Sequence, residues 1–320
     1  MNPKLKQIIT IYCSSIIIYG LGLLTVRYGP YYASALSTQT QQTLLLLFVT
    51  YLLISPVYYL KYATEKTVNK PFIALRALRR ITNSFIKSNE KYHLSTEEKT
   101  AFLFILVKLF FLPLMINFLY GNITLFTQEL KRLSWYPLAL SFIFMVDTFI
   151  FVIGYSTESK RLNNIVRSVE PTFLGWTVAL ICYPPFNSMV GNYIPWGAND
   201  YAFFGNAIVT TIAQVFVIGL LSIYLWASIA LGTKASNLTN RGIVTKFPYS
   251  LVRHPAYISK NLVWWLTLLP VINWKFALGM AFWTIIYCCR AWTEERHLRQ
   301  DSEYQEYCKK VQWRFIPYLI

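Results

Sequence analysis

The chain has 320 residues, of which 55% are hydrophobic and 17% aromatic, while only 14% are charged. Ordinary soluble domains carry about 25% charged residues, so this composition excludes that class and indicates a polytopic membrane protein. The 30 Lys and Arg residues outnumber the 14 Asp and Glu residues, which gives a formal net charge of +16. No nucleic-acid-binding motif accompanies this charge. Basic loops at a membrane surface therefore explain it better than a nucleic-acid partner.

Hydrophobic segments recur along the chain without a Gly/Ser-rich or Pro-rich linker between them. A helix needs about 20 apolar residues to cross the hydrocarbon of a bilayer. We expect an all-α, polytopic helical bundle of about eight transmembrane segments, which ends in a C-terminal helical hairpin. The expected spans are residues 8–26, 44–60, 101–120, 136–154, 173–189 and 203–231, followed by the hairpin arms 257–269 and 274–290.

The charges of the loops between these spans predict the orientation. Loops on one side, including both termini, carry 24 Lys and Arg residues, and loops on the other side carry 3. The positive-inside rule then places both termini in the cytoplasm. We expect an N-terminal transmembrane bundle over residues 1–231, with a basic cytoplasmic loop at 61–100, and a functional core with a cytoplasmic tail over residues 232–320.

Several features outside the core have two readings. Within the loop 61–100, Arg76, Arg79, Arg80 and Lys87 lie between apolar residues at helical spacing, which is typical of an interfacial helix on anionic lipid; an acceptor-binding role is the alternative. Asp147 lies in mid-span, where pairing inside the bundle competes with a role in chemistry.

Other single features favour structural roles. We expect Lys108 to extend toward the membrane surface. The pair Pro184-Pro185 is expected to break the fifth span. The five cysteines form no CxxC pattern and only three histidines are present, so we expect neither a disulfide framework nor a metal site.

The most informative segment lies between residues 241 and 314. Arg253-His254-Pro255 precedes the first hairpin arm, where Pro255 suits the first position of a helix and the free backbone amides of its first turn favour an anion. Arg253 can add a planar two-point clamp for a carboxylate or phosphate. At the end of the second arm, Arg290 and Glu294 are four residues apart and share a helix face, so an ordinary salt bridge between them is the alternative to a binding role.

The combination of RGIVTKFPYSLVRHPAY, a hydrophobic hairpin, RAWTEERHL and YQEYCKKVQWRFIP resembles the C-terminal core of the isoprenylcysteine carboxyl methyltransferase and phospholipid methyltransferase superfamily of membrane enzymes. The resemblance covers roughly the last 85 residues. Asp301-Ser302 stands where that superfamily typically has a Phe-Gly pair, and the run between EERHL and YQEY is shorter than usual.

The resemblance implies an S-adenosylmethionine site. It implies that the residues that bind the cofactor are Arg241, Gly242, Ile243, Val244, Tyr249, His254, Tyr257, Glu294 and Glu295. Arg290 matches a family arginine that faces the acceptor, and Arg253 is the second candidate for a catalytic role. Trp264, Trp265 and Trp283 are candidates for the lining of a lateral opening toward lipid, although packing is the usual role of tryptophan at this depth.

We therefore expect a multi-pass membrane methyltransferase whose active site faces the cytoplasm. Its cofactor is expected to be S-adenosylmethionine, and its partners membrane lipids and a lipophilic methyl acceptor such as an isoprenylcysteine-like carboxylate or a lipid, without nucleic acid or metal. Two alternatives remain open at this point: an NADPH-dependent enzyme similar to sterol reductases, and a non-catalytic lipid-binding or transport protein.

Overall fold

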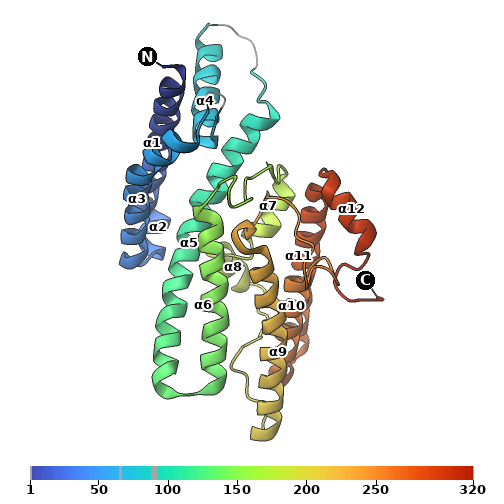
Figure 1. Cartoon of the computed structure of the whole chain (residues 1–320). Helices are drawn as coiled ribbons and strands as arrows, with labels where there is room; N and C mark the ends of the chain where they lie inside the picture. The colour runs from blue at the N-terminus through green and yellow to red at the C-terminus, as the bar shows by residue number, and fades with distance from the viewer. Residues whose placement is uncertain (1, 65–66, 88–91, 320) are drawn as a thin grey trace. The chain divides into compact units, whose positions relative to one another are not determined.

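The computed structural model describes residues 2–64, 67–87 and 92–319, so residues 65–66 and 88–91 of the predicted basic loop lie outside the described residues. The chain divides into two compact units, Met1–Tyr120 and Gly121–Ile320. Its secondary structure is mostly helical (Figure 1), as predicted. The predicted functional division at residue 231 does not coincide with this boundary and stays a prediction.

The first unit consists of helices with short connections. They are α1 (Pro3–Tyr28), α2 (Pro30–Ala35), α3 (Thr38–Tyr62), α4 (Lys70–Lys87) and the first part of α5 (Thr96–Arg132). Asn117 of α5 fixes the start of α3, because its side chain accepts from the backbone N–H of Ser37 and donates to the carbonyl of Ala35. Lys108 does not extend away from the unit: its Nζ lies 4.9 Å from the ring centroid of Tyr19.

The predicted helix in the basic loop is present as α4. Its residues Ile73 and Ala74 are buried against Ala101 of α5, and α4 also packs against α1. Leu78 and Ile86 remain exposed. Protein therefore covers part of the apolar face of α4, and contact of the rest with lipid stays a prediction.

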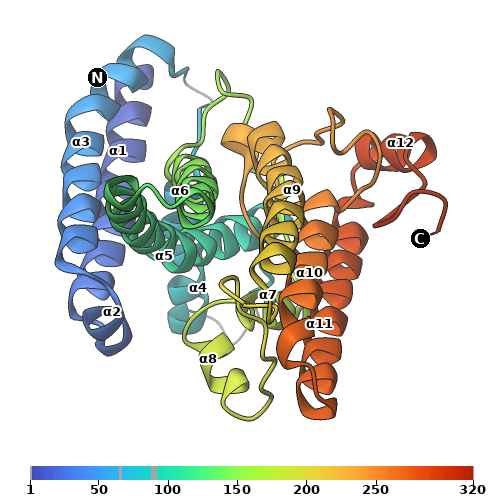
Figure 2. The ribbon, with the colours of Figure 1, turned by 90° about the horizontal axis from the view of Figure 1, so that it is seen from below.

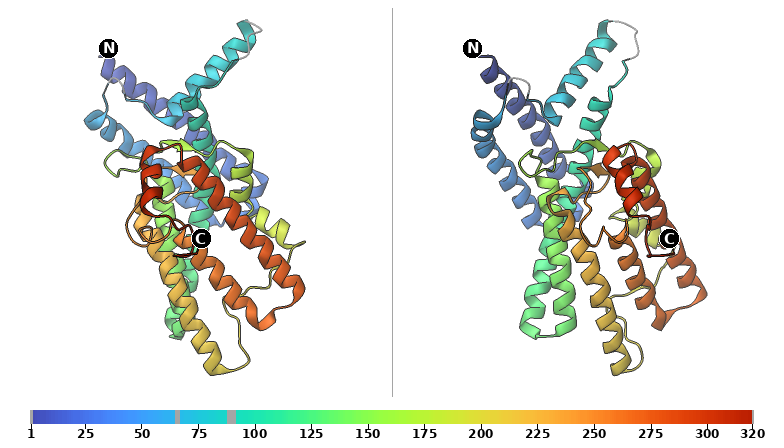
Figure 3. Two further views of the ribbon diagram at one scale, coloured as in Figure 1. Left: turned by 90° about the vertical axis from the view of Figure 1, so that its right-hand side faces the viewer. Right: turned by 45° about the vertical axis from the view of Figure 1, so that its right-hand side comes forward.

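The second unit contains the rest of α5 and all later elements. They are α6 (Trp135–Ser156), β1 (Ser168–Val169), α7 (Phe173–Leu180), α8 (Phe186–Gly191), α9 (Ala207–Leu231), the short 3-10 helix η1 (Gly232–Lys234), β2 (Thr239–Asn240), α10 (Pro255–Leu268), the 3-10 turn η2 (Leu269–Val271), α11 (Trp274–Leu298) and α12 (Ser302–Lys310). Figure 3 shows α10 and α11 as the two arms of the predicted hairpin.

Five helices of the described residues are long and apolar enough to cross a membrane. They are Pro3–Tyr28, Thr38–Tyr62, Thr96–Arg132, Trp135–Ser156 and Ala207–Lys234. The expected span over residues 173–189 is broken, as predicted at Pro184-Pro185, but the helix already ends at Leu180 and only the short helices α7 and α8 form. Eight helical residues extend about 12 Å, far less than the roughly 30 Å of bilayer hydrocarbon.

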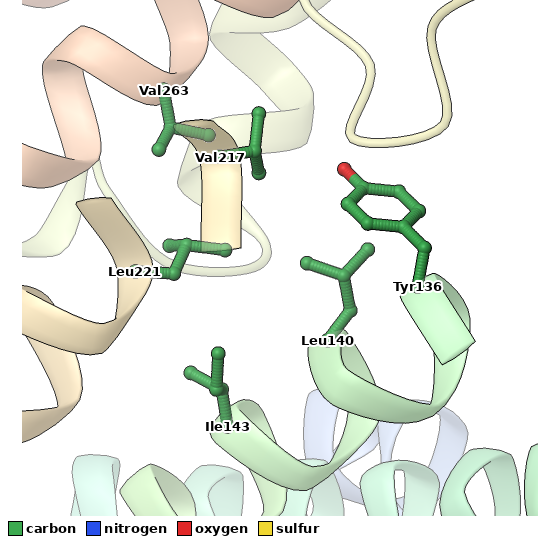
Figure 4. Close-up of a cluster of buried hydrophobic side chains, with 6 residues drawn as sticks. All are labelled: Tyr136, Leu140, Ile143, Val217, Leu221 and Val263. Atoms are coloured by element: carbon green, nitrogen blue, oxygen red, sulfur yellow. The ribbon is translucent and has the colours of Figure 1, made fainter. Parts of the chain in front are cut away.

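The core of the second unit lies where α9 packs against α6 and α10 (Figures 2 and 4). Figure 4 shows side chains of these three helices meeting in one cluster, which consists of Tyr136, Leu140, Ile143, Val217, Leu221 and Val263. Buried Asp147 of α6 accepts hydrogen bonds from Tyr224 Oη (2.7 Å) and Ser228 Oγ (2.5 Å), both on α9. Asp147 thus forms hydrogen bonds inside the bundle, which favours a structural role over a role in chemistry.

Two contacts fix the segment after α9. The strands β1 and β2 pair antiparallel, with Ser168 opposite Asn240. This two-residue ladder is the departure from an all-α fold within the described residues. The second contact is between Gly154 of α6 and the backbone of Ala235. A Cβ atom at position 154 would be 2.0 Å from the carbonyl oxygen of Ala235. Only glycine allows this approach of α6 to the loop 232–238.

The close approach at Gly154 predicts the effect of a methyl group. Gly154→Ala should lower the free energy of unfolding by about 1–3 kcal/mol, because the backbone at Ala235 has to move. Gly219→Ala on α9 is the matched control, because no atom lies within 4 Å of its added Cβ, and alanine raises helix propensity by up to about 1 kcal/mol. Thermal unfolding of the purified proteins in detergent compares the two. Equal stability of both variants would contradict the close approach.

Candidate functional site

Two neighbouring cavities in the second unit contain most of the candidate residues. The larger, the tyrosine cavity, has about 700 Å³ of non-protein space including its open mouth. Its lining residues are Phe151, Tyr183, Tyr224, Ser228, Leu231, Ser236, Asn237, Tyr249, Arg253, His254, Pro255, Ala256, Tyr257, Lys260, Tyr287, Arg290 and Glu294.

The smaller, the glutamate cavity, has about 440 Å³ on the same measure. Its lining residues are Glu170, Gly175, Ala179, Ser236, Asn237, Leu238, Thr239, Tyr257, Arg290, Thr293, Glu294, His297 and Leu298. Ser236, Asn237, Tyr257, Arg290 and Glu294 line both cavities. These five residues form the wall that the cavities share.

Helices α10 and α11 position the candidate residues Tyr257, Arg290 and Glu294. The Tyr257 hydroxyl donates to Glu294 Oε2 at 2.7 Å and joins the first turn of α10 to the last turns of α11. The ring of His254 stacks on that of Tyr257, with centroids 5.3 Å apart and planes at 9°. Residues about 40 positions apart are thus held in one site, as the spacing of the two motifs predicts.

Arg290 is buried in the shared wall. Its guanidinium donates to Asn237 Oδ1 and lies 5.2 Å from the Tyr257 ring, 5.7 Å from Tyr183 and 5.8 Å from Tyr287. No ion pair within 4 Å joins Arg290 to a carboxylate in the described part of the chain. The salt bridge with Glu294, the alternative expected from the sequence, is not formed. Arg290 is therefore a buried cation that faces two cavities without an acidic partner.

Glu295 lies on another side of α11 and lines neither cavity. Its carboxylate, 2% exposed, accepts from Arg253 Nε at 2.8 Å and from His254 Nε2 at 3.1 Å. Arg314 and Arg299 approach its other oxygen at 3.2 and 3.5 Å. Glu295 thus lies away from these two cavities and its bonds favour a structural role, so its predicted cofactor role stays a prediction.

The guanidinium of Arg253 also donates its hydrogen bonds to other groups of the protein. Besides Glu295, its Nη1 donates to the carbonyls of Val311 and Gln312, each at 2.8 Å. The backbone N–H groups of Arg253 and His254 donate to the carbonyls of Trp313 and Arg314. Arg253 lines the tyrosine cavity, but its guanidinium secures the C-terminal tail against the start of α10. An anion clamp at Arg253 would compete with these bonds.

The segment predicted to wrap the cofactor lies only partly at the site. Tyr249 lines the tyrosine cavity and its carbonyl accepts from the Tyr307 hydroxyl at 2.6 Å. Arg241, Gly242, Ile243 and Val244 line neither of the two cavities. Arg241 is buried and donates to the carbonyls of Thr157 and Asn164, while Ile243 packs beside Tyr304.

The backbone conformation at position 242 explains why a glycine stands there. Its φ is +90°, a conformation that side chains other than glycine rarely adopt, and its N–H donates to Asn240 Oδ1 at 2.8 Å. Asn240 Nδ2 in turn donates to Asp301, the residue that departs from the family pattern. Asp301 also pairs with Arg167 at 2.9 Å. These bonds attach the start of α12 to the β1–β2 ladder.

The three tryptophans that were candidates for the lining of a lateral opening, Trp264, Trp265 and Trp283, have packing contacts in the structure. Trp283 is buried with Leu268 and Met280. Trp264 packs edge-on against Tyr287 with centroids 5.1 Å apart, and Trp265 Nε1 donates to Thr284 at 3.0 Å. None of the three lines either of the two cavities.

The sequence did not identify several residues that line the cavities. One of them is Asn237, whose side-chain oxygen accepts a hydrogen bond from Arg290 and whose side-chain nitrogen donates to the hydroxyls of Tyr155 and Tyr183. Glu170 precedes α7, and its loop 156–170 also contains Glu158, so the sequence offers no signal that distinguishes it. His297 also lines the glutamate cavity; burial lowers the pKa of its ring, and its Nε2 forms a hydrogen bond with Ser168 Oγ at 2.8 Å.

Comparison of the chain with models of protein families, with curated proteins and with solved structures found no match. The functional argument therefore depends on the geometry of the two cavities.

The network around Glu295 predicts a pH-dependent stability. Burial raises the pKa of its carboxyl, but the bonds from His254 and Arg253 outweigh burial and lower the pKa from 4.5 to about 2. A carboxyl with a lowered pKa stabilises the fold above its unfolded pKa, and this stabilisation is lost as the pH falls through the folded value. Wild-type stability should therefore decrease between about pH 5 and pH 2.

The variant Glu295→Gln should lose about 3 kcal/mol at pH 7, because the buried cations keep no charged partner. It should also lose most of the decrease in stability below pH 5. Thermal unfolding in detergent across this pH range measures both effects. Glu303→Gln is the control, since Glu303 is exposed and pairs with exposed Arg167. Parallel pH profiles for Glu295→Gln and wild type would exclude this role of Glu295.

Proposed function

We propose that the protein is an integral membrane methyltransferase that uses S-adenosylmethionine and acts on an acceptor dissolved in the membrane. The observation that carries this proposal is the lining of the tyrosine cavity. Tyr249, His254, Tyr257 and Glu294 come from three separate segments and line this cavity together with Arg290. These are the positions to which the family resemblance assigns cofactor and acceptor.

The residues of the site fit the demands of methyl transfer. When bound, S-adenosylmethionine supplies an electrophilic methyl group on a sulfonium. The protein then has to position two ligands in line and exclude water, which in favourable geometry lowers a barrier by about 7–11 kcal/mol. Buried Arg290 can pair with an anionic group of the acceptor. Glu294, fixed by Tyr257, can accept hydrogen bonds from the cofactor.

The path of the chain supports a site at the cytoplasmic end of the second unit. The segment from α7 through α8 to residue 206 runs from the end where α6 finishes to the end where α9 begins (Figure 1). We propose that this broken segment makes one of eight passages, with both termini in the cytoplasm. Irregular backbone at membrane depth requires cover by protein, and α7 packs against α11.

The proposal predicts loss of methyl transfer in two site variants. Arg290→Ala removes a cation that, among the described residues, is alone in lining both cavities, and Glu294→Gln removes a carboxylate from the proposed cofactor side. Each should lower transfer of labelled methyl groups from S-adenosylmethionine to membrane lipids by at least about 100-fold, equal to about 2.7 kcal/mol. Glu303→Gln should keep wild-type activity, because Glu303 lies outside both cavities.

The assay uses membranes that contain the full chain, followed by lipid extraction and mass analysis of the labelled product. Binding of S-adenosylmethionine to the purified protein, without competition by NADPH, separates the methyltransferase from the reductase alternative. Full function of both site variants would instead favour a non-catalytic lipid-binding protein. Failure of wild-type protein to bind the cofactor would overturn the proposal.

A further inference from the structure

The carboxylate of Glu170 is bonded on one side only. Its Oε1 accepts from the Thr172 N–H at 3.0 Å, the Thr172 hydroxyl at 2.5 Å and Arg296 Nη2 at 2.8 Å. Its Oε2 is buried and has no hydrogen-bond donor among the described residues. A buried acceptor without a donor is destabilising. Glu170 lines the glutamate cavity, so a ligand in this cavity can supply the missing donor.

The neighbouring polar groups of this cavity already have partners. His297 is paired with Ser168, and the hydroxyl of Thr293 donates to the carbonyl of Arg290. The hydroxyls of Ser236 and Thr239 are bonded to each other. The acceptors with capacity left for a ligand belong to the carboxylates of Glu170 and Glu294, while Arg290 in the shared wall keeps guanidinium N–H donors beyond its bond to Asn237. A ligand that fits has at least two donors.

The charges around the cavity favour a neutral ligand over an ion. Glu170 is paired with Arg296, and Glu294 shares the cavity wall with Arg290. The two carboxylates and the two arginines sum to no net charge, although Glu294 and Arg290 form no ion pair with each other, so the cavity as a whole attracts neither a free anion nor a free cation strongly. Two adjacent hydroxyl groups supply two donors without adding charge.

We propose that the glutamate cavity is a binding site for a vicinal diol, with Glu170 as the acceptor for one hydroxyl and Glu294 as the acceptor for its neighbour. This inference deepens the proposed function and rests on it in part, because the ribose of the methyl donor is one source of such a diol. The polyol headgroup of a membrane lipid is the other. Glu170 lies outside the part of the chain that carries the family resemblance.

Gly175 keeps Glu170 in this position. A Cβ atom on Gly175 would lie 2.3 Å from Glu170 Cγ and 2.6 Å from its Cδ. Gly175 also donates its N–H to the hydroxyl of Thr172, which caps α7. Alanine suits a helix but would displace the carboxylate, so Gly175→Ala moves Glu170 without removing it.

The test measures binding of S-adenosylhomocysteine and of its 2′-deoxy and 3′-deoxy analogues to the purified full chain by calorimetry. Wild-type protein should bind at least one deoxy analogue about tenfold or more weakly than the parent. Glu170→Gln and Gly175→Ala should each weaken binding of the parent about tenfold. Binding of that deoxy analogue should not change, because the analogue already lacks the hydroxyl that would donate to Glu170. Glu303→Gln should bind all three ligands like wild type.

A second series separates the sources of the diol. It compares dihexanoyl phosphatidylglycerol, whose headgroup has a vicinal diol, with dihexanoyl phosphatidylethanolamine, which lacks one. If the diol belongs to a lipid, Glu170→Gln should weaken only the binding of the phosphatidylglycerol. Binding of S-adenosylhomocysteine should then stay the same as in wild type. Either pattern supports a diol site at Glu170.

Two results would overturn the inference. If wild-type protein binds the parent and both deoxy analogues equally, and the two lipids equally, no diol is recognised; this comparison needs no variant and does not depend on how the variants fold. If folded Glu170→Gln binds every ligand like wild type, Glu170 is not the acceptor. Tight binding of S-adenosylhomocysteine with either result would leave the proposed function intact, whereas no binding by wild-type protein would exclude the proposed function itself.

Discussion

The buried carboxylate of Glu295 is the contact on which the site depends. It holds Arg253 and His254 at the start of α10 and Arg314 in the C-terminal tail. A carboxylate with so little exposure is stable only with charged and hydrogen-bonded partners. Because these partners come from two segments and Glu295 itself lies on α11, one side chain fixes the start of the hairpin, its end and the tail relative to one another. His254, and through it the stacked Tyr257 ring, is thereby oriented before any ligand binds.

The two adjacent glutamates of α11 have different tasks for a geometric reason. Consecutive residues of a helix point about 100° apart. Glu295 faces the tail and is buried by it, while Glu294 faces the cavities and accepts from Tyr257. The sequence shows the pair of acids but not the direction of each side chain. The same limit explains Arg253 and Arg290: both were predicted to bind an anion, and the structure places only Arg290 where no carboxylate neutralises it.

The sequence predicted the helical class, the basic helix α4, the hairpin and the meeting of His254 with Glu294 at one cavity. These features follow from hydrophobic period and from the return of a hairpin to its starting side. It could not predict the break of residues 173–189 into α7 and α8 in detail, because a proline pair permits either a kink or an end. Nor could it identify Glu170 or Asn237, whose importance depends on the β1–β2 ladder between segments about 70 residues apart.

The wall between the cavities is rigid where a transfer reaction needs rigidity. Asn237, which receives Arg290, is itself fixed by the hydroxyls of Tyr155 and Tyr183. Arg290 is held among the rings of Tyr183, Tyr257 and Tyr287, where the faces of aromatic rings attract a cation without neutralising it. A guanidinium held in this way keeps its charge and its position for an anionic group of a ligand. Since bound geometry rather than acid–base help controls methyl transfer, such a fixed cation between two spaces is the feature that best connects this fold with the proposed chemistry.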